Sequence, residues 1–144
     1  MRALGVLRRG AVAGAVGTAV MTAAQAVEMR VSGRPPSLVP GEVAAKLLRR
    51  KGRGEVERLS LPMHLAHGLA NGTLRAMIGR AGLHGPGASA LHFGALWSSD
   101  VALYMALGVA GPPRRWTFDE LYPDVLHKAI YCAATGAAYD RLAR

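Results

Sequence analysis

The sequence predicts an all-α protein, a four-helix transmembrane bundle with one short amphipathic surface helix between the first and second spans. Three observations predict this class for a single domain of residues 1–144. Of the residues, 51% are hydrophobic but only 6% are aromatic, and long uncharged stretches recur along the chain. Lys and Arg gather at the ends of these stretches. Inside them the polar residues are His, Asn, Ser, Thr and single carboxylates, whereas a soluble helix exposes Lys, Glu and Arg.

The first predicted span covers about residues 10–28. Its eighteen residues from Gly10 to Val27 carry no charge and would form a helix about 27 Å long. Helical spacing places small and then polar residues on one side: Gly10, Gly14, Gly17, Met21, Gln25 and Glu28. Small residues let helix backbones approach closely, so the three glycines are predicted to be helix-packing positions and a face for self-assembly.

The same segment also resembles a signal peptide. Arg8 and Arg9 precede the apolar stretch, and Ala24-Gln25-Ala26 has the small-x-small pattern of a cleavage site. Cleavage there would leave a secreted soluble helical domain that begins near Val27. The helical pattern continues through Glu28 and further apolar stretches follow, which favours a retained span.

Residues 31–52 are predicted to form a connector followed by the surface helix. Gly and Pro punctuate the first part, and the helix runs from about Pro40 to Arg50. Val43, Leu47 and Leu48 are expected on one side of it. The helix is too short to span a bilayer, so it is predicted to lie on the membrane surface, although packing on a soluble core fits the same pattern.

The second predicted span covers about residues 60–79, with Ser60 as its cap and Pro62 in its first turn. On a helical wheel two stripes separate. One stripe is polar and consists of His64, His67, Asn71 and Arg75. The other is mainly apolar and consists of Leu65, Leu69, Thr73 and Met77.

The third and fourth predicted spans cover about residues 88–109 and 121–140. The third contains one charge, Asp100, and has His92 at the margin of its polar side. A capping box at Thr117–Glu120 opens the last helix, and Pro123 is expected to kink or restart it. Its polar face carries Asp124, His127 and Tyr131.

The net charge of +9 excludes few functions by itself. Basic residues abut the uncharged runs, as in juxtamembrane segments, and no groove-reading module or aromatic interleaving indicates nucleic acid binding. In the predicted four-span topology, eleven Lys or Arg lie on the same side of the membrane as residues 29–59, and seven lie on the opposite side. The positive-inside rule therefore places residues 29–59 in the cytoplasm and both termini outside, whereas Arg8 and Arg9 argue for the reverse.

Polar residues of the four spans are predicted to face one another and to form one intramembrane cluster. Its candidate members are Glu28, His64, His67, Asn71, His92, Asp100, Asp124, His127 and Tyr131. Such groups can relay protons around Asp100, or they can fix helix packing by hydrogen bonds. His64 and His67 have an i, i+3 spacing that could ligate a metal, and His residues on two spans could hold a haem; the primary expectation is no cofactor.

No motif indicates an enzyme. The chain lacks a G-x-S-x-G nucleophile motif and a phosphate-binding glycine loop. The single Cys132 lies in an apolar helix and is expected to be inert packing.

The layout of several segments resembles small multi-span bacterial integral membrane proteins of unknown function, including the YagU-like inner-membrane group. The segments are RRGAVAGAVGTAVMTAAQ, GRPPSLVP, HLAHGLANGTLRAMIG, HFGALWSSD and DELYPDVLHKAIYCAATGAAYDRLA. The resemblance implies a multi-pass protein of the bacterial inner membrane and supplies no activity.

The sequence therefore predicts a small non-enzymatic integral membrane protein with an accessory or structural role in the cell membrane. Its expected partners are the lipid bilayer and either a second copy or another membrane protein. A proton-coupled transporter or ion channel that uses Asp100 and the His residues is the alternative.

Overall fold

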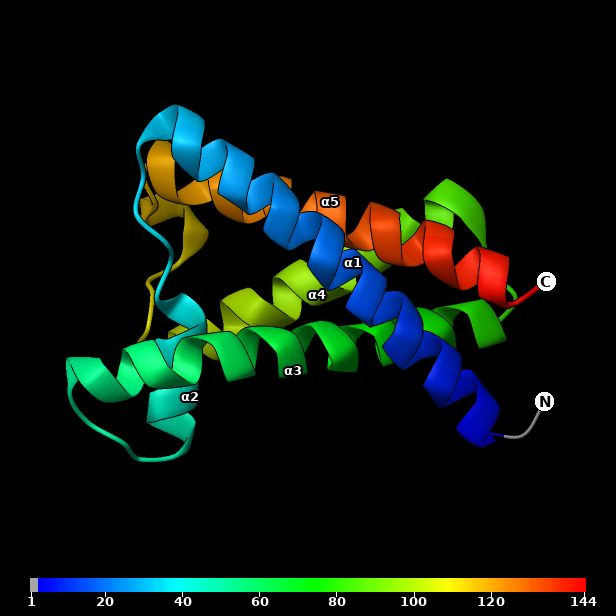
Figure 1. The fold of residues 1–144 in the computed structure, drawn as a ribbon, viewed down its shortest axis with the longest axis horizontal. Coiled ribbons are helices and arrows are strands. Elements are labelled where there is room, and N and C mark those ends of the chain that lie inside the picture. The colour runs from blue at the N-terminus through cyan, green and yellow to red at the C-terminus, as the bar shows by residue number, and fades with distance from the viewer. Residues whose placement is uncertain (1–2) are drawn as a thin grey trace.

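A computed structural model describes residues 3–144, which fold into five α-helices and one short 3-10 helix (Figure 1). The elements are α1 (Ala3–Ser32), α2 (Val39–Leu47), α3 (Arg53–Arg80), α4 (Gly85–Leu107), η1 (Pro113–Arg115) and α5 (Phe118–Leu142). The predicted all-α class is confirmed. Helix α1 packs on α3 and α5, α4 packs on α5, and the short α2 packs on α3. The start of α1 and the end of α5 lie at the same end of the bundle (Figure 1).

The helices extend beyond the expected spans: α1 begins at Ala3 and not near residue 10, and α4 begins at Gly85 and not near residue 88. Helix α3 begins at Arg53, before the expected start near residue 60, and Pro62 lies inside it. A proline there removes one backbone hydrogen bond, but the first turns of α3 pack against α2, where Gly41 lies against the Val56 carbonyl. Helix α5 has the predicted capping box at Thr117 and runs through Pro123 as one helix.

The expected apolar side of α2 is wrong. Val43 is buried against α3 with Gly41, Ala44 and Ala45, whereas Leu47 and Leu48 are exposed at the end of the helix. The short helix therefore buries small residues, because α2 approaches α3 too closely for larger ones. Leu47 and Leu48 face outward beside the basic turn that follows.

Glycines on two helices create the close crossing of α1 and α3. A Cβ on Gly14 would lie 2.5 Å from the Gly68 carbonyl oxygen, and one on Gly72 would lie 2.6 Å from the Gly14 Cα. Gly10 meets the same part of α3, and Gly17 meets α5 instead. The face at residues 10–17 is thus covered by α3 and α5 of the same chain. Self-assembly of the protein stays a prediction.

Several polar and charged side chains are buried inside the bundle, and rows of large apolar side chains lie on its outside. Polar and apolar groups share the interior, because the largest fully buried side chains are Arg75, Tyr139, Leu96, His92, Thr135 and Cys132. Large hydrophobic side chains are exposed along α1 (Val12, Val16, Val20, Val27, Val31) and along α3 (Leu61, Leu65, Leu69, Met77). In the described part of the chain, α1 alone is long and apolar enough, by length and composition, to cross a membrane.

Candidate functional site

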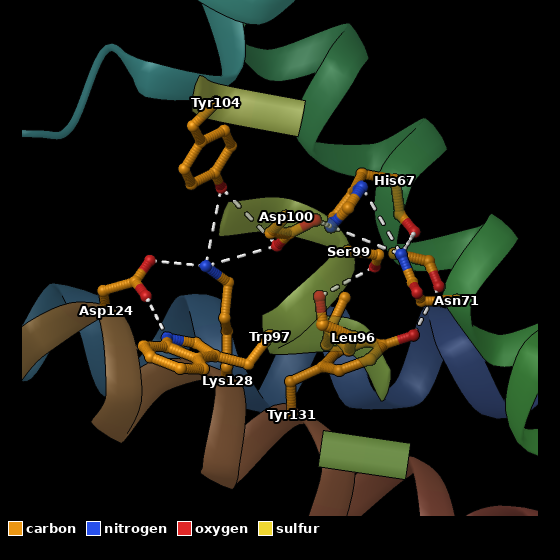
Figure 2. Close-up of polar contacts among 11 residues, drawn as sticks. His67, Asn71, Leu96, Trp97, Ser99, Asp100, Tyr104, Asp124, Lys128 and Tyr131 are labelled. Carbon is orange, nitrogen blue, oxygen red and sulfur yellow. Dashed lines mark hydrogen bonds and ion pairs between the residues drawn. The ribbon is translucent and has the colours of Figure 1, made fainter. Parts of the chain in front are cut away.

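A buried ionic cluster connects α3, α4 and α5 (Figure 2). We define it as Asp100 and Tyr104 of α4, Asp124 and Lys128 of α5, and His67 of α3. The Lys128 ammonium lies 3.2 Å from Asp100 Oδ2 and also contacts Asp124 Oδ1. One lysine on α5 thereby binds a carboxylate of its own helix and one of the neighbouring helix.

Asp100 is the most buried member, with only 3% of its side chain exposed. Its Oδ1 lies 3.2 Å from His67 Nε2, and its Oδ2 accepts a longer hydrogen bond of 3.5 Å from the Tyr104 hydroxyl. A buried carboxylate costs several kcal/mol unless its partners compensate the lost hydration. Partners from three different helices therefore make the position of Asp100 depend on the assembled bundle.

The formal charge of the ionic cluster depends on His67. Two carboxylates and one ammonium give a net charge of −1, and a proton on His67 would bring the sum to zero. His67 has 36% of its side chain exposed, more than the Asp100, Asp124 or Lys128 side chains. The imidazole is therefore more accessible than the three charged side chains of the ionic cluster.

Further hydrogen bonds fix the edges of the ionic cluster. The Trp97 indole N–H donates to Asp124 Oδ2 at 2.9 Å. The Asn71 amide donates to the His67 carbonyl oxygen at 3.0 Å and also contacts its ring. The Tyr131 hydroxyl donates to the Gly68 carbonyl oxygen and joins α5 to α3 (Figure 2).

A second buried charge lies toward the opposite end of the bundle. The Arg75 guanidinium is completely buried, contacts Asp140 Oδ1 at 2.6 Å and lies over the Tyr139 ring. Asp140 Oδ2 also accepts the backbone N–H of Gly85 at 2.9 Å, and Oδ1 lies 3.2 Å from His84 Nδ1. One carboxylate near the end of α5 thus holds α3 and the start of α4.

The structure divides the predicted polar cluster. His67, Asn71, Asp100 and Asp124 lie in or beside the ionic cluster, and Tyr131 bonds to the neighbouring turn of α3. Glu28 instead pairs with Arg34 at 2.7 Å and lies 3.8 Å from His127. His64 bonds to Thr22 on α1, and His92 is fully buried against the Tyr131 ring. The predicted set therefore forms separate contacts, and not one continuous cluster.

Sequence reasoning missed the two partners on α5 that balance the buried charges, Lys128 and Asp140. Lys128 stands four residues after Asp124, a spacing that predicts a helical ion pair. No comparable local signal exists for Asp140, since its partner Arg75 is 65 residues away. The Gly68-x-x-x-Gly72 motif was also missed, although it repeats the spacing of Gly10 and Gly14.

The two histidines considered as metal ligands bind different groups. His64 faces Thr22, whereas His67 faces Asp100. Among residues 3–144, no group of three or more His, Cys, Asp or Glu side chains could hold a metal ion. Cys132 is buried beside Leu96 and Tyr131, as a packing residue would be.

No family model, no curated protein and no solved structure matches this chain. The function must therefore be inferred from the arrangement of side chains. Two features are informative: the rows of exposed large apolar side chains on α1 and α3, and the ionic cluster around Asp100.

Proposed function

We propose that the chain is an integral membrane protein in which α1, α3, α4 and α5 cross the bilayer, with an accessory or structural role and no enzymatic activity. The observation that carries the proposal is the outward position of the apolar stripes on α1 and α3. In water, each exposed leucine or valine would forgo up to about 1.5–3 kcal/mol of burial. A bilayer removes this cost, and it also explains why the ionisable groups lie inside.

Helix α4 has suitable dimensions for a span. It has 23 residues, or roughly 34 Å, which exceeds a hydrocarbon core of about 30 Å. Asp100 is the only charged residue between Gly85 and Leu107. Asp100 and His92 make α4 less apolar by composition, but both side chains are buried and would not meet lipid. Lys128 likewise makes α5 less apolar by composition, although its side chain is buried.

The packing of α1 supports its retention as a span. At Gly10, Gly14 and Gly17, α1 lies so close to α3 or α5 that a larger residue would clash. Removal of residues 1–26 as a signal peptide would uncover these contacts and the buried residues around them. We therefore propose that residues 1–26 remain in the mature protein, as the resemblance to small inner-membrane proteins also implies.

Cysteine labelling in intact membranes tests the proposed topology. In a Cys132→Ser background, Leu83→Cys in the α3–α4 turn and Arg50→Cys after α2 are expected to react with a membrane-impermeant maleimide from opposite faces. Leu69→Cys on the exposed stripe of α3 is expected to stay unlabelled until detergent is added, because lipid covers it. The measurement is the mass shift of each variant in right-side-out and inverted vesicles. Rapid labelling of Leu69→Cys from water would refute the spanning arrangement.

The ionic cluster supports the structural role. Lys128, Asp100 and His67 join three helices whose outer surfaces would contact only lipid, where apolar contacts provide no driving force for helix association. Polar contacts within the bundle then specify which helix faces meet. A small protein of this design could serve as a stable membrane platform for another membrane protein.

A proton-coupled transporter or channel is the second candidate function, and the His67–Asp100 contact favours it. The imidazole is partly exposed and its Nε2 lies 3.2 Å from the buried carboxylate. A proton that binds there would neutralise the net charge of the ionic cluster, and such a change can alter helix packing.

Proton flux through the reconstituted protein tests the second candidate. Asp100→Asn is expected to lower the flux at least tenfold, because the amide keeps the shape of the carboxylate but cannot accept the proton. Flux is measured with a pH-sensitive dye trapped in vesicles under an imposed gradient. Asp119→Asn removes an exposed carboxylate of the first turn of α5 and serves as the matched control. Equal flux through both variants would exclude a proton path through Asp100.

A further inference from the structure

We propose that the basic turn between α2 and α3 binds the phosphate of an anionic phospholipid headgroup. We name this place the headgroup site and define it by Lys46, Arg50 and Lys51. The turn lies at the end of the bundle opposite the start of α1 and the end of α5 (Figure 1). The inference rests on the proposed function for the source of the phosphate, since only a chain in the membrane meets such lipids continuously.

The cations of the headgroup site have no anionic partner among the described residues. No hydrogen bond or ion pair joins the side chain of Lys46, Arg50 or Lys51 to residues 3–144. The next basic residues differ, because Arg53 pairs with Glu57 at 2.8 Å and Arg58 lies 3.6 Å from Glu55. The chain therefore neutralises the arginines on the first turns of α3 and leaves three adjacent cations available.

The three cations line one hollow of about 290 Å³. Val56 of α3 and Val109, just beyond α4, also line it, together with the carboxylate-bearing Glu42. The hollow thus combines an excess of positive charge with apolar walls. A phosphodiester with attached acyl chains has both properties, whereas a free inorganic ion has only the first.

Backbone geometry directs the cations toward this hollow. Arg49 adopts a left-handed conformation with φ of 54°, which is costly for a residue other than glycine. The Arg50 N–H then donates to the Ala45 carbonyl oxygen at 2.8 Å and closes the turn over the end of α2. The turn therefore brings Arg50 and Lys51 back beside Lys46, and it does so with a strained arginine in place of glycine.

Neighbouring side chains match a membrane surface. Leu47 and Leu48 are exposed by 54% and 59% immediately before the basic residues. On a surface helix, such leucines enter the boundary between headgroups and acyl chains while adjacent cations bind phosphates. The cations can thus contact the phosphate of a phospholipid while Leu47 and Leu48 contact its acyl chains.

Equilibrium binding to the detergent-solubilised full chain tests the headgroup site. The probes are dioctanoyl phosphatidylglycerol, dioctanoyl phosphatidylcholine and inorganic phosphate, and native mass spectrometry counts the bound molecules. We expect one tightly bound phosphatidylglycerol. Arg50→Gln with Lys51→Gln should weaken it about tenfold or more, because each basic residue near an anionic headgroup contributes substantially to binding.

The matched control removes the same charge from the paired arginines. Arg53→Gln with Arg58→Gln is expected to change phosphatidylglycerol binding less than twofold. Equal weakening by both double variants would indicate a net-charge effect and overturn the site. Inorganic phosphate that binds as tightly as phosphatidylglycerol would overturn the lipid assignment, as would equal binding of phosphatidylcholine.

Failure of this inference differs from failure of the proposed function. If the cysteine labelling supports four spans but the Arg50, Lys51 double variant binds phosphatidylglycerol normally, the headgroup site alone is refuted. If Leu69→Cys is labelled from water while phosphatidylglycerol binding keeps its dependence on Arg50 and Lys51, the site is supported and the spanning arrangement is refuted.

Discussion

Gly72→Ala is expected to destabilise the protein by about 3 kcal/mol or more, because overpacked sites with no room to relax lie at the upper end of the usual cost. The new Cβ would lie 2.6 Å from the Gly14 Cα and against the Gly10 carbonyl oxygen. Both are backbone atoms, so no side chain can rotate away and α1 must separate from α3. Thermal unfolding of the purified protein in detergent measures the effect.

Gly94→Ala is the matched control for Gly72→Ala. Gly94 lies inside α4, is exposed and has open space where its Cβ would be. The same substitution there should leave the protein unchanged or stabilise it by up to about 1 kcal/mol through helix propensity. Similar unfolding temperatures for the two variants would show that the glycine crossing of α1 and α3 does not determine stability.

Lys128→Met is expected to cost about 3–5 kcal/mol, the usual cost of removing one partner from a buried ion pair. The variant leaves Asp100 buried and Asp124 without the ammonium that both carboxylates contact. Methionine keeps most of the length and the apolar stem of the lysine, so the loss reports charge and not packing. Denaturant unfolding in detergent, followed by circular dichroism, gives the change in free energy of unfolding.

Two further variants separate charge compensation from general effects. Arg53→Met breaks an ion pair whose side chains are 83% and 53% exposed, and it should cost at most about 1 kcal/mol. The double variant Lys128→Met with Asp100→Asn removes a charge of each sign and should recover part of the loss of Lys128→Met. A double variant whose cost equals the sum of the single costs would contradict direct coupling of Lys128 and Asp100.

On the long helices α3 and α4, the direction of several side chains was predictable from the sequence because it follows helical periodicity. On α3, Arg75 is fully buried and His67 is half-buried, whereas Leu65 and Leu69 of the other stripe are exposed. The inward position of Asp100 follows from the same periodicity and from the cost of a buried carboxylate. These parts of the fold need no knowledge of the neighbouring helix.

Contacts between helices could not be predicted in the same way. Nothing local to Lys128 indicates that it contacts Asp100 on another helix. Periodicity places Glu28 and His127 on the same faces as the other ionisable residues. In the structure, α1 crosses the bundle, so Glu28 lies near His127 and away from the ionic cluster. Crossing angles decide such pairings, and they depend on glycines of two helices together. The position of Leu47 outside the α2–α3 contact was missed for the same reason.

The buried pair of Arg75 and Asp140 has a consequence for the order in which the molecule forms. The two residues are 65 positions apart, and Arg75 is fully buried. During synthesis the guanidinium has no carboxylate to compensate it until Asp140 has left the ribosome. Until then Arg75 has to stay outside a closed interior, so final closure of the bundle follows translation of the turn that carries Asp140.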